Sequence, residues 1–590
     1  MSMARDRAAC PPALKFFPAR SRSGADKKRS GETTMTIDRT TLRWNGWGPV
    51  RQENPLPGDA PQWHWIEETL GLSRLPSTPA VALHDIRLPH TRLSNGTLGK
   101  LREIVGENQL RTDDYERAFH ARGKSYHDLL YVRAGNLDMA PDAVVYPRSA
   151  DEVLAVVKLC AEEDISLIPY GGGSSVVGGV NAMSKSLGGA VITLDTTLMT
   201  RIVQIDKVSM TARIEAGIYG PALEEQLQSH GVTLGHYPQS FQYSTLGGWI
   251  AARGAGQQSN RYGKAEKWLV SAKLATPKGF WTTEATPASA AGPNLNQLVA
   301  GSEGTLGVIC EAVVKIHDLP ERKDYRGYLF KNFQAGVDAA RRINHAEIPV
   351  AMVRLSDAPE TYFFQTFSAT NTGGLKAKLQ RAYLKMKGFD NAPCLMLIGH
   401  EGDKDTVVWA QEQTEEICKR LGALALGTGP GKRWYHGRFN SPAVRDPMMD
   451  RGLGIDTLET STRWSNIANL HEKVIAAIDT AMSANMPEQN ARGIVMAHVS
   501  HSYPDGASLY FTFIFPRQLD REVTQWQALK RAASDAILMN GGTISHHHGV
   551  GTDHTPWLGE EKGPIGMSIL KATKREIDPK GVMNPGKLLG

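Results

Sequence analysis

The chain has 590 residues, of which 41% are hydrophobic and 22% charged, and its net charge is +6. This length is too great for one hydrophobic core, so we expect at least two domains. Residues 1–34 hold eight basic and three acidic residues and so carry five of the six net charges. The rest is nearly neutral and lacks the basic surface typical of nucleic-acid-binding proteins.

Cysteine usage and hydropathy narrow the class further. The five cysteines are scattered without a CxxC pair, so reduced thiols are expected rather than a disulfide framework or a zinc site. No apolar run approaches the roughly 18 residues that span a bilayer. Residues 1–34 lack an apolar signal core, and we interpret them as a disordered leader, a transit peptide or a start assigned upstream of Met35. We expect a largely helical region over 35–135.

Patterning becomes strong from Pro141. Ser149 and Glu152 form a capping-box signature, and apolar residues at helical spacing follow as far as Cys160. Strands are predicted at 165–168, 190–194, 202–205 and 211–216, and a helix from Pro221 to Gly231. This order indicates an α+β domain over 136–320 rather than a regular βαβ series.

The character of the chain shifts around 318–323. Mixed strands, at 350–355, 394–398 and 508–515, alternate with amphipathic helices, which predicts an inserted α/β cap domain over 321–535 that binds substrate. From 536 to 590 glycine-rich loops return, and we expect this segment to rejoin the first domain.

Three glycine-rich segments carry binding chemistry: PYGGGSS at 169–175, the loop within 238–256, and GSEGTLGVI at 301–309. Successive N–H groups in such turns suit phosphate oxygens, although a flexible surface loop is the alternative for any one of them. PYGGGSS is not the GxGxxG fingerprint, because no helix follows at once. Together the three segments indicate a long cofactor, a dinucleotide.

The run NGGTISHHHGVG contains three consecutive histidines, His546, His547 and His548. Adjacent side chains diverge on a helix or a strand, so the triplet is predicted to be a loop that lines a site. Imidazoles exchange protons or bind cations near neutral pH. A metal-binding loop is the alternative, but the nearest further ligands in sequence are only Asp553 and His554, so we predict no metal site.

These loops, with IDPKGVMNPGKLL at 577–589, resemble the FAD-binding domain of the vanillyl-alcohol oxidase/p-cresol methylhydroxylase (PCMH) superfamily. That resemblance implies a two-subdomain FAD domain with FAD between the subdomains, and a separate cap. Within that superfamily the chain resembles, more narrowly, the alkyldihydroxyacetonephosphate synthase family. The segments that carry this resemblance are RWNGWG (43–48), AFHARGKSYHDLLYVRAG (118–135), GHYPQS (235–240), ETS (459–461) and the triple histidine. The resemblance covers nearly everything after Met35.

The resemblance implies roles residue by residue. Tyr510 matches the catalytic acid/base, His546, His547 and His548 match a cluster required for activity, Arg445 contacts substrate, and His236 and Arg354 support activity. The residues implied to contact FAD are Pro169, Tyr170, Gly171, Gly172, Gly173, Ser174, Ser175, Gln239, Ser240, Phe241, Gln242, Tyr243, Ser244, Thr245, Ala252, Arg253, Gly254, Ala255, Glu303, Gly304, Thr305, Leu306, Gly307, Val308 and Ile309. With no histidine in PYGGGSS, FAD is predicted to be non-covalent.

The implied reaction is ether-lipid synthesis without net redox change. A fatty alcohol replaces the acyl group of acyl-dihydroxyacetone phosphate through an adduct at flavin N5. The corresponding expectations are lipid substrates, peripheral membrane association and a homodimer. A cytoplasmic location is expected because neither terminus resembles a peroxisomal signal.

Three departures keep alternatives open. The departures from the family pattern are FQYST (241–245), His498 and NPGKLL (584–589). The last of these is more similar to the C-terminal sequence of 2-hydroxy acid dehydrogenases than to that of the synthase family. An FAD-dependent dehydrogenase or oxidase of D-lactate-like acids is therefore the second hypothesis, although SHSYPDGASLYF keeps His501 and offers Tyr510 in place of a second histidine. A flavin-binding scaffold is the third. From the residues alone, core packing is the favoured interpretation of Tyr510, since it lies in a strand-like stretch with Phe511 and Phe513.

Overall fold

The computed structural model describes residues 41–51, 56–367 and 375–589, so the predicted leader and Met35 lie outside the described residues. The chain divides into two compact units: one contains Pro320–Arg438, and the other contains the residues before and after it. We describe each unit by itself. None of the helices in the described part of the chain is long and apolar enough to cross a membrane.

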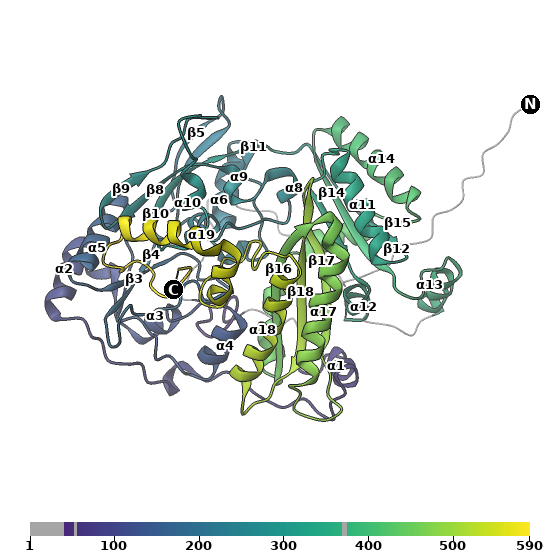
Figure 1. The fold of residues 1–590 in the computed structure, drawn as a ribbon, viewed down its shortest axis with the longest axis horizontal. Helices are drawn as coiled ribbons and strands as arrows, with labels where there is room; N and C mark the ends of the chain where they lie inside the picture. The colour runs from purple at the N-terminus through teal and green to yellow at the C-terminus, as the bar shows by residue number, and fades with distance from the viewer. Residues whose placement is uncertain (1–40, 52–55, 368–374, 590) are drawn as a thin grey trace, which may run out of the picture. The chain divides into compact units, whose positions relative to one another are not determined.

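The first sheet of the larger unit has four strands in the order β1-β2-β4-β3. Figure 1 labels two of them, β3 and β4. Strands β2, β4 and β3 are parallel, and β1 is antiparallel to β2. The strand bounds are β1 Leu110–Arg111, β2 Ala143–Val145, β3 Ser166–Tyr170 and β4 Val191–Asp195. Helix α5 (Ala150–Glu162) packs its predicted apolar face against this sheet, and the Ser149 side chain caps it by accepting from Glu152 N–H. PYGGGSS starts within β3, so the sheet positions this loop.

The second sheet of this unit is antiparallel, with the order β5-β6-β10-β8-β9. The strand bounds are β5 Ile202–Asp206, β6 Thr211–Glu215, β8 Leu269–Thr276, β9 Gly279–Thr282 and β10 Val308–Lys315. Helices α6 (Gly220–Ser229) and α7 (Leu246–Ala251) pack on it through a core that includes Leu223, Leu227 and Trp249. Two sheets of different type agree with the predicted two-subdomain α+β domain.

The C-terminal segment returns to the first sheet. Helix α19 (Thr555–Ile577) ends shortly before Val582, whose carbonyl accepts from Leu167 N–H at 2.8 Å. Asn584 N–H donates to Leu167 O at 2.8 Å, so Met583 pairs in parallel with β3. Residues 582–584 therefore cover the edge of the strand that leads into PYGGGSS.

A three-stranded antiparallel group, in the order β17-β18-β16, also belongs to the larger unit. Its strands are β16 Leu453–Arg463, β17 Ile494–Ser502 and β18 Gly506–Pro516. Helices α17 (Ile467–Ser483) and α18 (Glu522–Met539) lie beside these strands (Figure 1). Apolar residues of α17 at spacings of three and four, from Ile467 to Met482, are buried there.

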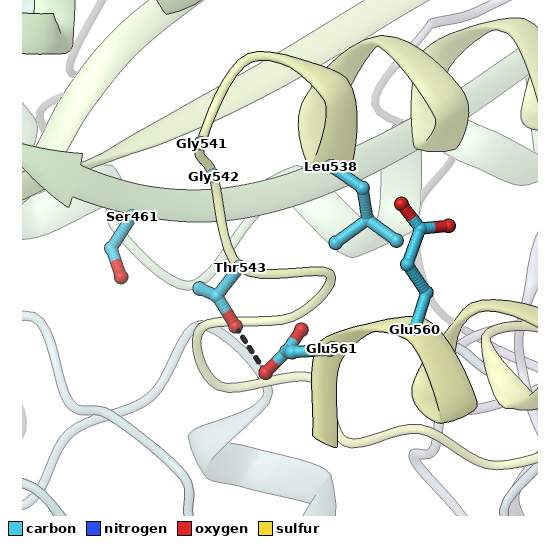
Figure 2. Close-up of a pocket in the computed structure, with 7 residues that line it drawn as sticks. All are labelled: Ser461, Leu538, Gly541, Gly542, Thr543, Glu560 and Glu561. Carbon is cyan, nitrogen blue, oxygen red and sulfur yellow. Dashed lines mark hydrogen bonds between the residues drawn. The ribbon is translucent and has the colours of Figure 1, made fainter. Parts of the chain in front are cut away.

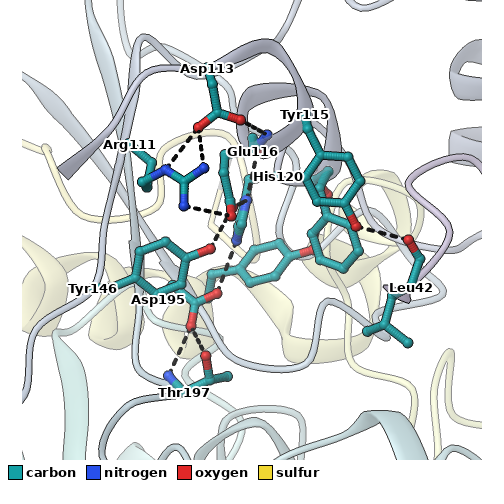
Figure 3. Close-up of polar contacts among 11 residues, drawn as sticks. Leu42, Arg111, Asp113, Tyr115, Glu116, His120, Tyr146, Asp195 and Thr197 are labelled. Atoms are coloured by element: carbon teal, nitrogen blue, oxygen red, sulfur yellow. Dashed lines mark hydrogen bonds and ion pairs between the residues drawn. The ribbon is translucent and has the colours of Figure 1, made fainter. Parts of the chain in front are cut away.

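The N-terminal part of the larger unit contains several short helices, joined by long irregular segments. Its helices are α1 Gln62–Leu70, α2 Asn95–Val105, α3 Asp114–Phe119 and α4 Tyr126–Arg133. A buried polar cluster joins α3 to the first sheet (Figure 3): His120 Nε2 lies 2.9 Å from Asp195 Oδ2, and Tyr146 OH donates to Glu116 at 2.5 Å. Thr197 donates to Asp195 Oδ1 through its N–H and its hydroxyl. Each charged group is thus partnered inside the protein.

The smaller unit, Pro320–Arg438, holds four strands in the order β15-β12-β14-β13. Their bounds are β12 Arg322–Phe330, β13 Met352–Ser356, β14 Cys394–Gly402 and β15 Leu424–Gly427. The helices are α11 Phe333–His345, α12 Ala358–Phe367, α13 Leu375–Met386, α14 Lys404–Arg420 and α15 Thr428–Gly437. This unit covers only the first part of the range predicted as a cap, because 439–535 belong to the larger unit.

Candidate active site

Tyr510 lies on the face of β18 opposite to the apolar side chains of that strand. Phe511 and Phe513 are fully buried, whereas Tyr510 is partly exposed. Its cross-strand neighbours are Glu459 on β16 and His498 on β17. The Tyr510 ring stacks on His498 at 4.9 Å and meets His548 edge-on at 5.6 Å. The strand therefore points this tyrosine into a polar cluster rather than the core.

A register shift redirects the end of β17. The pairing of β17 with β18 is irregular between Val499 and Ser502, as in a β-bulge. Ser500 then donates to Glu459 Oε1 at 2.5 Å, and the His501 ring lies 5.1 Å from that of His546. Strict alternation would place these neighbours on opposite faces, so the irregularity brings His501 into the cluster.

The histidine triplet is a loop, as predicted, between α18 and α19, and it lies along β16. His546 N–H donates to Glu459 O at 3.1 Å, and Thr543 N–H donates to Ser461 O at 3.2 Å. Figure 2 shows Glu561 pointing towards Thr543 at the start of this loop, beside a shallow pocket. Glu561 accepts from the Thr543 hydroxyl at 3.0 Å and from Ile544 N–H at 2.7 Å.

Glu303 holds the other end of the histidine loop. Its carboxylate accepts from Val550 N–H at 2.6 Å and from Gly551 N–H at 2.7 Å. A Cβ added at Gly549, where φ is +87°, would lie 3.0 Å from this carboxylate. Burial raises the pKa of Glu303 to about 7, although both hydrogen bonds lower it. The third predicted FAD loop and the histidine loop are thus joined by one side chain.

Two histidines share one buried carboxylate. Glu459 is fully buried; its Oε1 lies 3.2 Å from His546 Nδ1, and its Oε2 contacts His547 Nδ1. His546 Nε2 is hydrogen-bonded to Tyr503 OH at 2.6 Å, and Lys264 donates to His546 O at 2.6 Å. The backbone and both ring nitrogens of His546 therefore have fixed partners.

Burial sets the ionisation of the cluster. It lowers the pKa of His546 to about 4, with Lys264 adding to the effect, and it lowers the pKa of His548 well below its usual value. Burial alone would raise the pKa of Glu459, but His547 and His546 hold it well below the ordinary range. Burial raises the pKa of Tyr510 to about 12. At neutral pH Tyr510 is protonated and Glu459 is a carboxylate.

Arg445 lies near Tyr510, at the start of the short helix α16 (Arg445–Met449). It is only 9% exposed, and its Nη1 donates to Lys124 O at 3.0 Å. Its positive charge acts on Tyr510 and lowers the pKa of that phenol. The neighbouring Asp446 accepts from Trp47 N–H at 2.8 Å, so the RWNGWG segment packs against α16 and fixes Arg445.

The first two predicted FAD loops lie against each other. A Cβ on Gly171 would lie 2.3 Å from the Thr245 hydroxyl, and one on Gly172 would lie 1.9 Å from Tyr243 O. Gly173 has a φ of +67°, which favours glycine. Among the described residues, no acceptor is hydrogen-bonded to the N–H groups of 171–175. This row of free N–H groups fits a pyrophosphate.

Several side chains in these loops are engaged within the protein. Ser175 Oγ accepts from Gly179 N–H at 2.9 Å, Ser244 Oγ accepts from Trp249 Nε1 at 2.7 Å, and Arg253 donates to Gln297 at 2.9 Å. Val308 and Ile309 are the first residues of β10 rather than loop residues. A bound cofactor would therefore be held mainly by backbone groups, which suits the glycine content.

His236 and Arg354, the two other residues expected to support activity, belong to different units. His236 is buried against Trp249 and accepts from Trp268 Nε1 at 3.2 Å, and burial lowers its pKa to about 3. Its Nε2 would lie 3.6 Å from a Cβ added at Gly254, so it faces the loop 252–255. Arg354 belongs to the smaller unit and pairs with Glu360 at 3.2 Å.

Sequence reasoning missed part of this site. Four buried or half-buried residues, Glu459, His501, His546 and His547, offer ligand atoms that all lie within 4.8 Å of one another. The prediction of no metal site considered only neighbours in sequence, whereas the fold supplies Glu459 and His501 from two strands. The only local signals were the ETS motif and the histidine in SHSYPDG.

Comparisons with known proteins agree with this architecture. Residues 141–283 match the FAD binding domain family, and residues 319–588 match the family of FAD linked oxidases, C-terminal domain. Alkyldihydroxyacetonephosphate synthase of Dictyostelium discoideum is 34% identical over 548 residues, which are 92% of this chain and 87% of that protein. A solved alkyldihydroxyacetonephosphate synthase is 32% identical with a TM-score of 0.78 over 92% of this chain and 99% of its own.

A solved p-cresol methylhydroxylase has the same fold, with a TM-score of 0.63 at 15% identity over 84% of this chain and 97% of its own. These matches confirm the predicted PCMH-type fold, the FAD cofactor and the assignment as an FAD-dependent enzyme.

Proposed function

Because the chain belongs to the alkyldihydroxyacetonephosphate synthase family, we propose that it exchanges the acyl group of acyl-dihydroxyacetone phosphate for a long-chain alcohol. The product is an ether lipid precursor, the co-product is a fatty acid, and no net oxidation occurs. The observation that carries the proposal is the convergence of Tyr510, Arg445 and His548 on one polar face. That face combines a proton donor, an anion anchor and polar hydrogen-bonding groups.

Tyr510 is proposed to transfer protons at the substrate carbon. Its pKa of about 12 keeps the phenol protonated at neutral pH, so it serves first as an acid and then, as phenolate, as a base. Its edge-on contact with His548 and its stacking on His498 restrict the ring. A fixed ring keeps the hydroxyl in one position through both transfers.

Arg445 is proposed to bind the phosphate. Within the described residues Arg445 donates one hydrogen bond, to Lys124 O, which leaves other donors of the guanidinium fork for a phosphate. Burial to 9% exposure strengthens such a charged contact. Arg354 and His236 are proposed to support activity, His236 from behind the loop 252–255.

The histidine triplet is proposed to stabilise the departing carboxylate. Within the triplet His548 meets Tyr510 edge-on at 5.6 Å, and burial holds the pKa of His548 well below its usual value, so this imidazole is neutral at pH 7. A neutral imidazole donates a hydrogen bond from one ring nitrogen without carrying a charge that must be desolvated.

FAD is proposed to be held by the backbone groups of the three glycine-rich loops, without a covalent link. When bound, it supplies the nucleophilic ring nitrogen N5 at the reacting carbon. The free N–H groups of 171–175 support this placement for the pyrophosphate. Association with a membrane surface and a homodimer remain predictions, which vesicle flotation and light scattering check.

One assay tests the proposed function. The FAD-loaded chain is incubated with acyl-dihydroxyacetone phosphate and labelled hexadecanol, without an electron acceptor. We expect alkyl-dihydroxyacetone phosphate and free fatty acid in equal amounts. Acceptor-dependent oxidation of 2-hydroxy acids, with no ether product, would overturn the proposal in favour of a dehydrogenase.

A further inference from the structure

Four side chains of metal-ligand type converge from three separate segments of the larger unit. Glu459 comes from β16, His501 from the irregular end of β17, and His546 and His547 from the loop before α19. Their ligand atoms all lie within 4.8 Å of one another. We propose that Glu459, His501, His546 and His547 bind a divalent transition-metal ion of the Zn²⁺ class.

Two of the separations among these ligand atoms match the edges of a tetrahedral site. Zn–N and Zn–O bonds of about 2.0–2.1 Å place neighbouring ligand atoms roughly 3.3–3.4 Å apart on the edges of a tetrahedron. His546 Nδ1 lies 3.3 Å from His547 Nδ1, and Glu459 Oε1 lies 3.2 Å from His546 Nδ1. His546 Nδ1 thus lies, from two other potential ligand atoms, at the distances that one small cation would impose.

Hydrogen bonds alone satisfy this cluster poorly. The Nδ1 atoms of His546 and His547 face each other as well as the same carboxylate. His501 Nδ1 is buried without a hydrogen-bond partner among the described residues, and His501 is only 5% exposed. Glu459 Oε2, although it contacts His547 Nδ1, has no hydrogen bond of good geometry. Unpaired buried polar atoms are costly, and a bound cation provides the missing partner.

Outer groups hold the ligands in orientation. Tyr503 OH is bonded to His546 Nε2 at 2.6 Å, which leaves Nδ1 facing the cluster. Ser500 donates to Glu459 Oε1 at 2.5 Å, and Ser508 lies 2.7 Å from Ser500 Oγ. Metal-ligating histidines and carboxylates are usually oriented by such outer hydrogen bonds.

The donor set selects the class of ion. Three imidazoles with one carboxylate suit Zn²⁺ and similar ions, whereas Mg²⁺ and Ca²⁺ prefer oxygen ligands throughout. Coordination would occupy His546 and His547, leaving Tyr510 and His548 free for proton transfer. This inference goes beyond the proposed function, and metal content is measured without turnover, so either can fail alone.

Metal analysis of the full FAD-loaded chain tests the inference. The protein is stripped with a chelator, dialysed against Zn²⁺, separated from free ion and analysed by mass spectrometry. We expect one Zn²⁺ per chain for the wild type. Glu459→Gln and His501→Ala should weaken Zn²⁺ binding by roughly 100-fold or more, since loss of an outer partner alone costs about 10- to 100-fold.

His498→Ala is the matched control, because His498 lies on the same strand as His501 but stacks on Tyr510 outside the cluster. It should retain the wild-type Zn²⁺ content. FAD content and thermal melting show whether each variant folds. A wild type that takes up no more Zn²⁺ than the double variant Glu459→Gln, His501→Ala would overturn the inference.

A second measurement needs no variant. Co²⁺ added to the stripped wild-type protein should give the intense ligand-field absorption of a tetrahedral site, at wavelengths beyond the flavin bands. Added Zn²⁺ should abolish this absorption by displacing Co²⁺. Spectra identical to Co²⁺ in buffer would contradict the proposed site.

Discussion

The larger unit contains two buried clusters in which histidine meets carboxylate, and they differ in how their polar atoms are satisfied. In the cluster of Figure 3, His120 has Glu116 O at 2.7 Å on one ring nitrogen and Asp195 at 2.9 Å on the other, and it is fully buried. Around Glu459, two Nδ1 atoms compete for one carboxylate, and His501 Nδ1 lacks a partner.

The difference teaches how structural and functional clusters can be separated. A network in which every group has a protein partner stabilises the fold and leaves nothing for a ligand. A buried network with converging, unsatisfied groups costs stability and is typical of a site that binds a ligand. Residue types alone do not make this distinction, since both clusters contain His, Glu and Tyr.

The largest effect is expected for Tyr510→Phe. Loss of the phenol should lower the turnover number by about 10²- to 10⁴-fold, because the phenol is the group proposed to transfer protons at the substrate carbon, while FAD binding is retained. Ether formation and flavin absorbance are measured on the same sample. Tyr362→Phe, at an exposed position of the smaller unit, should match the wild type. Full activity of Tyr510→Phe would remove Tyr510 from its proposed role.

Asp195→Ala should lower stability and leave turnover unchanged, which is the opposite of the effect expected for Tyr510→Phe. Removal of the Asp195 carboxylate takes away a hydrogen-bond partner of the buried His120 ring and should lower the free energy of unfolding by about 1–3 kcal/mol. Denaturant unfolding measures this loss, and turnover per FAD-loaded, folded molecule should stay at the wild-type level. A stable variant with slow turnover would break the proposed contrast between the two clusters.

The ionisation of Glu303 should make the free energy of unfolding depend on pH. In the folded chain it keeps its proton to about pH 7, whereas the unfolded chain releases it near the ordinary value of 4.5. The folded state therefore binds more protons between these values, and the stability contributed by Glu303 is lost as pH rises to 7.

Relative to Glu303→Gln, the wild-type free energy of unfolding should fall between pH 5 and 7, by at most about 1.4 kcal/mol per pH unit. Urea unfolding of both proteins at several pH values checks this slope, with Glu560→Gln as the control. Parallel stability curves for wild type and Glu303→Gln would show that Glu303 titrates normally.

The smallest effect is expected for His64→Ala. His64 is exposed and pairs with Glu68 at 3.3 Å on the surface of α1. Such pairs contribute about 0–1 kcal/mol, so stability, FAD content and turnover should all stay close to those of the wild type. A larger loss of stability would mean that exposed histidine–carboxylate contacts also stabilise this chain. That result would contradict the proposed distinction between the two buried clusters.

Local sequence signals predicted much of the FAD-binding half. Ser149 capped its helix as expected, and strand β3 was placed within two residues, because capping and apolar runs act over short distances. The triple histidine was correctly expected to be a loop, since glycines surround it. The three glycine-rich segments signalled the cofactor because free backbone N–H groups require small residues.

The rest depended on contacts distant in sequence. Glu459 and His501 meet the triplet through strand register and an irregularity in β17, which no periodic pattern records. The contact of Glu303 with the cofactor stays a prediction, whereas its carboxylate binds Val550 and Gly551, which are more than 240 positions away, and no local pattern indicated this contact. The strands β16 and β17 were not predicted either, because polar residues interrupt their alternation near the site.

The pairing of residues 582–584 with β3 has a consequence for biosynthesis. Roughly 400 residues separate Tyr170 from Val582, so the edge of β3 is made long before the segment that covers it. During translation that edge exposes unpaired N–H and C=O groups, which attract other extended chains. A truncated product that ends before Val582 keeps the exposed edge beside an incomplete flavin loop. Such fragments should aggregate rather than accumulate as soluble, colourless protein.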